Sequence, residues 1–235
     1  MKKEHKNLTV LGVAAHPDDL EFGASGTFIK WVRQGASCYY LICTDGSKGS
    51  DDPKMTTERL IKTRQEEQKA AGEIIGLKDV FFLDYPDTEL SPNLDLKRDI
   101  VRYIRMLRPD IVVALDPTIF YSTTRNFINH TDHRAAGNAT MDAVFPLARD
   151  RLTFPEHEAE GFTPHKVKQI YFVNFENYNE VVDISETFGT KIKALAAHKS
   201  QIKADAIDWV RQRSETLAKK HGFKHAESFI KITLK

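Results

Sequence analysis

Four short apolar runs, each separated from the next by a longer polar stretch, are the feature that most constrains how this chain of 235 residues can fold. The runs span residues 8–15, 39–43, 80–83 and 111–115. Continuous apolar runs are typical of strands that are buried on both faces, as in parallel sheets. The stretches between them predict helices at residues 23–35, 56–75 and 95–107. This alternation predicts a doubly wound α/β fold, in which a mainly parallel sheet carries helices on both faces.

The second half of the chain continues the pattern less regularly. In order, we expect an irregular loop at 116–129, a helix from Thr131, an irregular surface excursion at 153–164, strands at 170–173 and 181–184, two helices within 186–221 and a last strand at 228–234. No internal repeat or linker interrupts this order. With 41% hydrophobic residues, the chain has the size and composition of a single domain spanning residues 1–235.

Charge and hydropathy exclude several classes of partner. The 34 Lys and Arg residues nearly cancel the 33 Asp and Glu residues, so no basic field is available to bind nucleic acid. No apolar stretch approaches the ~18–20 residues needed to cross a bilayer. Residues 1–8 are too few and too polar to form a secretory signal. We therefore expect a cytoplasmic protein with no membrane span.

The two cysteines, Cys38 and Cys43, lie an odd number of positions apart in one predicted strand. Their side chains should therefore point to opposite faces of the sheet. This spacing argues against a disulfide or a thiolate metal site between them.

A first cluster of polar residues, His16-Pro17-Asp18-Asp19-Leu20-Glu21, follows the first predicted strand directly. In open parallel sheets, ligands bind outside the carboxyl ends of the strands, so this position is a candidate site. Charged groups beside a core need partners, which a bound ion or substrate would provide. For Asp18 or Asp19 taken alone, the cap of the next helix is the better explanation.

A second cluster, residues 129–134, follows the fourth strand and its long loop. His130 and His133 are three positions apart at the start of a predicted helix, so both can face one side, with Asp132 between them. Taken alone, His133 would be an ordinary surface histidine. Together, the two clusters offer two histidines and a carboxylate with further acids and bases, as in a catalytic zinc site that keeps one position open for water. Their conjunction at two strand ends predicts a metal site.

At these residues the chain resembles the PIG-L (LmbE-like) deacetylases, zinc amidases that act on N-acetylglucosamine conjugates. The resemblance begins at Ala15-His16-Pro17-Asp18-Asp19 and runs almost to the end of the chain. Further matches are Thr44-Asp45-Gly46, Arg64 with Glu67 and Gly76, Pro86-Asp87, His130-x-Asp132-His133-Arg134, Val182-Asp183-Ile184-Ser185, Lys191, His198, and Ala226-Glu227-Ser228-Phe229. An ordered series of this length is far more specific than the first motif alone.

The resemblance implies a Rossmann-like fold and a role for each matched residue. The implied roles are zinc ligands at His16, Asp19 and His133, a general base at Asp18, a general acid or oxyanion stabiliser at His130, an orienting carboxylate at Asp132, and a substrate contact at Arg64. One zinc ion per chain is implied, with Fe²⁺ as an alternative in the cell. The implied substrate is a small N-acetylated sugar conjugate, and the family resemblance also leads us to expect a homo-oligomer.

The chain departs from the family pattern in two places. Thr131 stands where the family most often has proline, and the segment 117–129 is longer than in the small thiol-pathway members. This segment contains Phe120, Tyr121, Arg125 and Phe127, which suit sugar stacking and an anionic aglycone. An ordinary packed loop explains them equally well.

Other functions fit the sequence less well. Phosphoester hydrolysis usually employs two metals, and too few acids remain near the clusters to hold a second ion. A dinucleotide site would need G-x-G-x-x-G in the first turn, where this chain has HPDDLEFGASG. A metal-dependent amidase for a non-sugar amide remains an alternative. So does a sugar-binding member without turnover, although the complete set of six ionisable site residues argues against it.

Overall fold

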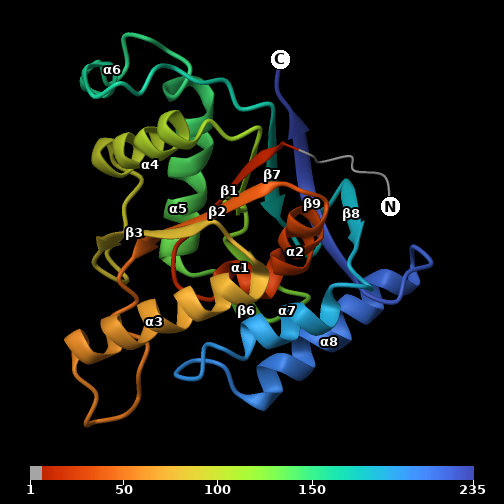
Figure 1. The fold of residues 1–235 in the computed structure, drawn as a ribbon. Helices are drawn as coiled ribbons and strands as arrows, with labels where there is room; N and C mark the ends of the chain where they lie inside the picture. The colour runs from red at the N-terminus through yellow and green to blue at the C-terminus, as the bar shows by residue number, and fades with distance from the viewer. Residues whose placement is uncertain (1–6) are drawn as a thin grey trace.

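The computed structural model describes residues 7–235, and a seven-stranded sheet forms its centre (Figure 1). The strand order is β3-β2-β1-β4-β7-β9-β8. The strands of this sheet are β1 (Thr9–Ala14), β2 (Ser37–Thr44), β3 (Asp79–Tyr85), β4 (Ile111–Leu115), β7 (Gln169–Val173), β8 (Glu180–Asp183) and β9 (Ala226–Thr233). The first five strands in that order pair in parallel, and β9 pairs antiparallel with both β7 and β8. The predicted α/β class with a mainly parallel sheet is confirmed.

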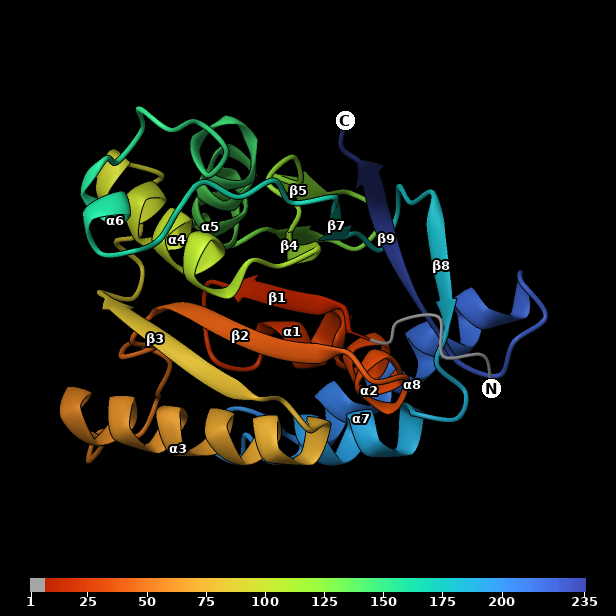
Figure 2. The same ribbon diagram turned by 45° about the horizontal axis from the view of Figure 1, so that its top comes forward.

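Helices cover both faces of the sheet (Figures 1 and 2). They are α1 (Asp19–Gly23), α2 (Ser25–Arg33), α3 (Thr57–Ile75), α4 (Leu94–Leu107), α5 (Thr131–Asp142) with the irregular turn η1 (Ala143–Leu147), α6 (Glu156–Ala159), α7 (Phe188–Leu195) and α8 (Ala204–Lys219). Helices α4 and α5 pack on one face, where Leu11 and Val13 of β1 point. Helices α1, α2, α3 and α7 pack on the other face, against Val10 and Ala14. The apolar run of β1 is thus buried on both sides, as a central parallel strand requires.

The two cysteines contribute to different faces of the sheet, as predicted. Cys38 belongs to the core under α2 and α3, and Cys43 belongs to the core under α4 and α5. Both are buried and free. The alternation of side chains along β2 accounts for this separation.

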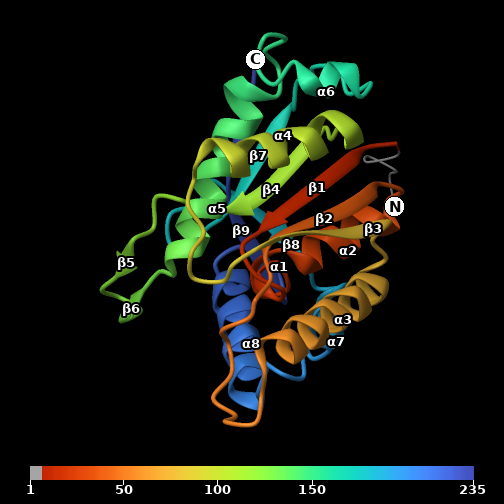
Figure 3. The same cartoon turned by 90° about the vertical axis from the view of Figure 1, so that its left-hand side faces the viewer.

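Three predicted segments differ in detail. The helix expected at residues 23–35 is α2, and a short helix that the sequence did not predict, α1, precedes it; Ala24, with φ −140°, interrupts the helical backbone between the two. The loop at 116–129 contains a short antiparallel hairpin, β5 (Tyr121–Ser122) and β6 (Phe127–Ile128), which projects from the body of the molecule (Figure 3). The stretch at 153–164 contains α6.

The segment before α6 is anchored by a buried arginine. Arg105 of α4 is 2% exposed, and its guanidinium donates hydrogen bonds to five backbone carbonyls. These carbonyls belong to Leu147, Ala148, Asp150, Thr153 and Phe154. The planar fork of the guanidinium can serve several acceptors at once, which explains how an irregular segment packs against the core.

The direction in which the chain adds strands to the sheet reverses between β1 and β4. The chain runs from β1 outward to β2 and β3, and it then returns to place β4 on the other side of β1. This switch point is where open α/β sheets bind ligands, at the carboxyl ends of the strands. Helix α5 packs closely against the carboxyl end of β4. A Cβ atom at Gly137 would lie only 2.3 Å from the carbonyl oxygen of Leu115, so the close packing requires glycine at this position. The first turn of α5 is therefore held at the switch point.

Residues 1–6 lie outside the described structure, so the expectation about the N-terminal segment falls largely outside it. None of the helices within residues 7–235 combines the length and apolar character needed to cross a membrane.

Candidate active site

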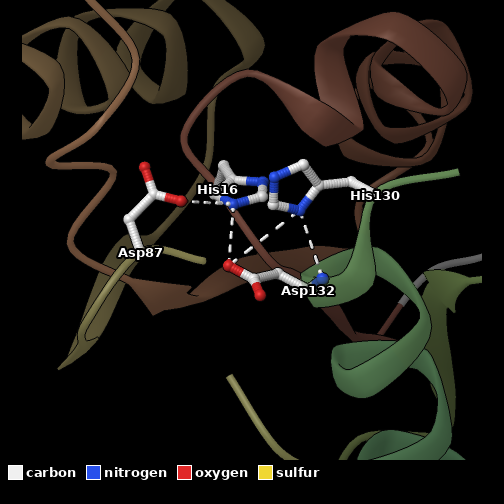
Figure 4. Close-up of side chains that lie close together, drawn as sticks. All are labelled: His16, Asp87, His130 and Asp132. Carbon is white, nitrogen blue, oxygen red and sulfur yellow. Dashed lines mark hydrogen bonds and ion pairs between the residues drawn. The ribbon is translucent and has the colours of Figure 1, made fainter. Parts of the chain in front are cut away.

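The structure brings the two polar clusters together at the switch point. His16 follows β1, and His130 and His133 lie at the start of α5, which follows β4 and its hairpin loop. The imidazole ring of His16 lies with its centroid 4.7 Å from that of His130 and 5.3 Å from that of His133. Figure 4 shows the rings of His16 and His130 side by side, with Asp132 next to both.

Asp19 lies between the two histidines that the resemblance assigns as ligands. Its Oδ1 atom is 3.0 Å from Nε2 of His133, and its Oδ2 atom is 3.7 Å from Nδ1 of His16. One donor atom from each of the three residues lies within 4.8 Å of the others. The same Asp19 Oδ2 accepts hydrogen bonds from the backbone N–H groups of His16 and Ala15, which hold the carboxylate in place.

In both His16 and His133, the ring nitrogen that points away from Asp19 has a hydrogen-bond partner. Nε2 of His16 lies 3.1 Å from Asp87 Oδ1 and 3.2 Å from Asp132 Oδ2 (Figure 4). Nδ1 of His133 lies 3.1 Å from Asn129 Oδ1. A histidine that binds a metal through one nitrogen usually donates its other N–H to such an acceptor. The donor set of two histidines and a carboxylate therefore fits one metal ion.

A second group of potential ligands overlaps the first. It consists of His16, Asp87, His130 and Asp132. Most of its atoms already have partners: Nδ1 of His130 accepts the backbone N–H of Asp132, Oδ2 of Asp132 accepts that of Thr88, and Oδ2 of Asp87 accepts that of Lys48. We interpret Asp87, His130 and Asp132 as residues that surround the first site, because the two carboxylates orient its ligand His16.

The electrostatics of the site favour a positive charge at His16. Burial by itself opposes protonation of this ring, but the hydrogen bonds to Asp132, Asp19 and Asp87 outweigh it and raise the pKa of His16 to about 11. A charge can be supplied there either by a proton or by a metal ion, and the two compete.

Asp18 has a strained backbone and a side chain directed at the site. Its φ of 94° lies in the left-handed region, and its side chain forms no cap hydrogen bond with α1, so capping does not explain it. Its Oδ2 atom lies 3.4 Å from Nη2 of Arg64. Burial and the neighbouring charge of Asp19 raise the pKa of Asp18 to about 7, against the opposing effect of Arg64.

Arg64 is buried and bound to the loops around the site. Its guanidinium donates to the carbonyl oxygens of Gly46 at 3.0 Å and Pro17 at 2.9 Å. The side chain also lines the cavity. These contacts give Arg64 a role in positioning the loops, and its contact with a substrate stays a prediction.

The carboxylate of Asp132 lies closer to His16 than to His130. The distance from its Oδ2 is 3.2 Å to Nε2 of His16 and 4.0 Å to Nδ1 of His130. Nδ1 of His130 accepts a hydrogen bond from the backbone N–H of Asp132 at 3.2 Å. Burial, followed by the nearby His16, lowers the pKa of His130. The lowered pKa favours the neutral ring, and the hydrogen bond that Nδ1 accepts leaves the proton of that neutral ring on Nε2.

Three residues of the site had no role assigned from the sequence. Asp87 follows β3, where the strand-end rule could have indicated it. Asn129 is the first residue of the second cluster, directly before His130. Gln68 occupies the buried stripe of α3 one turn after Arg64, and a polar residue in such a stripe is the only local signal that it carries.

A cavity of about 820 Å³ opens over this site. Its lining includes all of His16, Asp18, Asp19, Arg64, His130 and His133, and it continues past Arg125 and Phe127 to Phe22, Phe175 and Trp209. The cavity therefore reaches from the candidate metal ligands to helix α8.

The chain belongs to the PIG-L family. The family model described as GlcNAc-PI de-N-acetylase matches residues 11–144, which include every residue of the candidate site described above. The site and the match to the family thus coincide.

Two relatives and one solved structure that resemble the chain are named as deacetylases of N-acetylated sugars. The chain is 34% identical to the diacetylchitobiose deacetylase of Thermococcus kodakarensis over 222 residues, covering 93% of this chain and 80% of that relative. It is 29% identical to the probable N-acetyl-α-D-glucosaminyl L-malate deacetylase 2 of Bacillus anthracis, covering 86% of this chain and 85% of that relative. Among solved structures, the N,N'-diacetylchitobiose deacetylase of Pyrococcus horikoshii, in complex with an inhibitor, superimposes with a TM-score of 0.88 at 27% identity, over 96% of this chain and 84% of that one.

Proposed function

We propose that this chain is a zinc-dependent deacetylase that hydrolyses the N-acetyl group of an N-acetylglucosamine conjugate and releases acetate and the free amine. The observation that carries the proposal is the arrangement of His16, Asp19 and His133. Each histidine directs one ring nitrogen toward Asp19. The other ring nitrogen of each lies within hydrogen-bond distance of an acceptor outside the ligand set. The names of the relatives support the acetamide as the bond that is cleaved.

His16, Asp19 and His133 would hold the metal. A zinc ion bound there supplies Lewis acidity, which polarises the acetamide carbonyl and makes water acidic enough to lose a proton near neutral pH. Iron(II) is the alternative ion for the same donors. Asp87, Asp132 and Asn129 would keep the histidine rings oriented, since outer acceptors of this kind set the tautomer of a ligand.

Asp18 would act as the general base. Its carboxylate lies beside Asp19 and lines the cavity, and its pKa of about 7 suits proton transfer near neutral pH. Arg64, at 3.4 Å, would orient the carboxylate and stabilise its charged form. After taking a proton from the attacking water, Asp18 can deliver it to the departing amine, which is too basic to leave as an anion.

His130 would stabilise the oxyanion. Because Nδ1 accepts a backbone hydrogen bond, the proton of the neutral ring is on Nε2. An N–H of this kind can donate to the developing negative charge without first being protonated. The backbone N–H of Asp132 fixes the tautomer of His130. Through this hydrogen bond, Asp132 would orient the His130 ring.

Amine release tests the proposal directly. Metal-loaded protein would be incubated with N-acetylglucosamine, diacetylchitobiose, an N-acetylglucosaminyl malate and an acetylated amino acid. Wild type would be compared with Asp18→Asn, which removes the base, and with Asp208→Asn, an exposed acid of α8 that serves as the matched control. Metal content would be measured for each protein.

We expect at least one sugar conjugate to be deacetylated, with kcat lowered about 100-fold or more in Asp18→Asn and unchanged in Asp208→Asn. All three proteins should retain about one metal ion per chain, because Asp18 is not a ligand in this proposal. If amine is released only from the acetylated amino acid, the chain is an amidase for a non-sugar amide and not a sugar deacetylase. A metal-loaded protein that releases no amine from any compound would sink the proposal.

A further inference from the structure

A pair of buried, ionisable side chains lies behind Asp18 and away from the cavity. They are Glu21 of α1 and His198, in the turn between α7 and α8, and both are 0% exposed. Among residues 7–235, neither belongs to the lining of the cavity that includes Asp18. Neither side chain can therefore touch a substrate there, and any effect of the pair on the reaction must pass through other residues.

The contact between the two side chains is an ion pair without hydrogen bonds. Nε2 of His198 lies 3.7 Å from Oε2 of Glu21. Within the described part of the chain, neither of these two atoms has a hydrogen-bond partner, and Nδ1 of His198 has none either. Buried polar atoms are normally hydrogen-bonded, and a buried ion pair is often no more stabilising than an apolar pair of similar volume. Stability of the fold alone therefore does not explain this pair.

The surroundings of His198 favour its charged form. Burial opposes protonation of the ring, but the contact with Glu21, followed by the charges of Glu21 and Asp18, outweighs burial and raises the pKa of His198. Glu67 of α3 acts in the same direction. The ring therefore keeps its proton to a higher pH than an ordinary histidine does, and it attracts the carboxylate of Glu21.

The other oxygen of Glu21 leads to the proposed base. Oε1 of Glu21 accepts a hydrogen bond from Nε2 of Gln68 at 2.9 Å. Oε1 of Gln68 in turn accepts the backbone N–H of Asp18 at 3.0 Å. A chain of three buried side chains thus begins at His198 and ends on the backbone of Asp18, whose φ of 94° requires support from its surroundings.

The turn that carries His198 is fixed to the helix that carries Gln68. The backbone N–H and the hydroxyl of Ser200 donate to the two carboxylate oxygens of Glu67, at 2.7 and 2.6 Å. Glu67 directly precedes Gln68 in α3. The position of His198 relative to Gln68 is thus set by a second, independent contact.

We propose that His198 and Glu21 act as positioning residues for the general base. Their ion pair fixes the Glu21 carboxylate, the carboxylate orients the amide of Gln68, and this amide holds Asp18 in its left-handed conformation. The inference rests on the proposed deacetylation, since that reaction gives Asp18 its role. Loss of the pair would free the amide of Gln68 to turn, and the carboxylate of Asp18 would leave the geometry needed for proton transfer.

Amide hydrogen exchange, followed by NMR, tests the support of Asp18 without a substrate. Metal-loaded wild type would be compared with His198→Leu and with the double variant His198→Leu, Glu21→Gln. The double variant leaves no buried charge unpaired and still offers an oxygen to Gln68, so it keeps the test open if the single variant does not fold. The control is His157→Leu, since His157 is another buried histidine and lies outside the cavity lining.

We expect the backbone N–H of Asp18 to exchange about tenfold faster in both His198 variants, as for a weakened hydrogen bond that opens locally, and at the wild-type rate in His157→Leu. His198→Gln keeps a donor for Glu21 without the charge, and it should fall between wild type and His198→Leu.

Amine release connects this support to the reaction. The kcat should fall about tenfold in His198→Leu, with KM and metal content unchanged, because only the base is displaced. In a Gln68→Met background, His198→Leu should lower kcat no further, since both changes interrupt the same path. A merely structural role would give independent losses in the two variants, and His157→Leu should retain the wild-type kcat.

An Asp18 amide that exchanges at the wild-type rate in the His198 variants would overturn the inference. So would losses of kcat that multiply in the combined Gln68 and His198 variant, or an equal loss in His157→Leu. If the wild type releases no amine while the Asp18 amide exchanges faster in His198→Leu, the proposed deacetylation fails and the support of Asp18 by the pair stands. The two proposals thus fail by different observations.

Discussion

The backbone N–H of Asp18 donates a 3.0 Å hydrogen bond to the side-chain Oε1 of Gln68, 50 positions further along the chain. The Nε2 group of Gln68 donates in turn to Glu21 at 2.9 Å, and Gln68 is fully buried. This amide therefore holds Asp18 at its left-handed φ of 94° and connects the proposed base to the buried end of α1. Residues in strained backbone conformations persist only where the surroundings support them.

Replacing Gln68 by methionine should impair catalysis without removing the metal. Gln68→Met keeps the volume but removes both hydrogen bonds, so we expect a lower kcat with unchanged metal content, and a loss of about 1–3 kcal/mol in the free energy of unfolding. Gln65→Met is the matched control, because Gln65 lies on the same helix and its side-chain amide donates to the exposed Asp84 at the surface. Steady-state kinetics and urea denaturation would measure both effects. An unchanged kcat in Gln68→Met would show that Asp18 does not need this support.

Asn129 should control the affinity for the metal. Among the residues that the structure describes, its Oδ1 is the only hydrogen-bond acceptor of Nδ1 of His133, at a distance of 3.1 Å. Asn129→Ala should weaken metal binding about 10- to 100-fold, as is usual when an outer partner of a ligating histidine is lost. Asn129→Asp keeps an acceptor and should recover much of the affinity. Competition with a chelator would measure the metal affinity of each variant. Asn177→Ala, at an exposed position, is the control. Equal affinity in Asn129→Ala would argue against His133 as a ligand.

The buried pair Lys191 and Glu227 should be essential for folding. Nζ of Lys191 lies 2.7 Å from Glu227 Oε1, with side-chain exposures of 1% and 4%, and it also donates to the carbonyl oxygens of Glu21 and Phe22. Lys191→Met leaves a buried charge without its partner and should cost about 3–5 kcal/mol in unfolding free energy.

The double variant Lys191→Met with Glu227→Gln should recover part of that loss, because no charge is then left unpaired. Lys62→Met, in an exposed pair with Glu66, should change the unfolding free energy by less than about 1 kcal/mol. Chemical denaturation would measure all three. A double variant as unstable as the single one would mean that packing and carbonyl contacts, and not the charge, dominate at Lys191.

His157 should make the protein less stable in acid. This side chain of α6 is 2% exposed, and its pKa is lowered by burial first and by the charge of Arg105 next. The unfolded chain therefore binds more protons than the folded one between the lowered pKa and the ordinary value of 6.5. The stability contributed by the neutral ring is complete above that ordinary value and is lost as the pH falls below it.

A His157→Leu variant cannot take up this proton. We expect the difference in urea midpoint between wild type and His157→Leu to shift against wild type as the pH falls from about 8 to about 5.5. The comparison of the two proteins cancels the contributions of the other histidines. A difference that stays constant over this range would contradict the proposed cause.

The arrangement of the sheet was predictable from the sequence because it depends on local patterns. The apolar run at β1 is continuous, and this alone identifies a strand covered on both faces. The candidate site residues His16, Asp19, His130 and His133, which the structure brings together, were also visible as local patterns, since they follow predicted strands. A strand end is visible within a few residues, and the topology rules then bring such ends together.

Only the tertiary structure decided how these groups face one another. Asp87 contacts His16 across 71 positions and Gln68 contacts Asp18 across 50, and no local period records either contact. The same limit hid Trp209, which resembles an ordinary apolar residue of α8 until Phe22 and Phe175 are placed beside it. A sequence pattern carries the burial and periodicity of each segment, whereas the distance between side chains on different segments depends on how those segments pack.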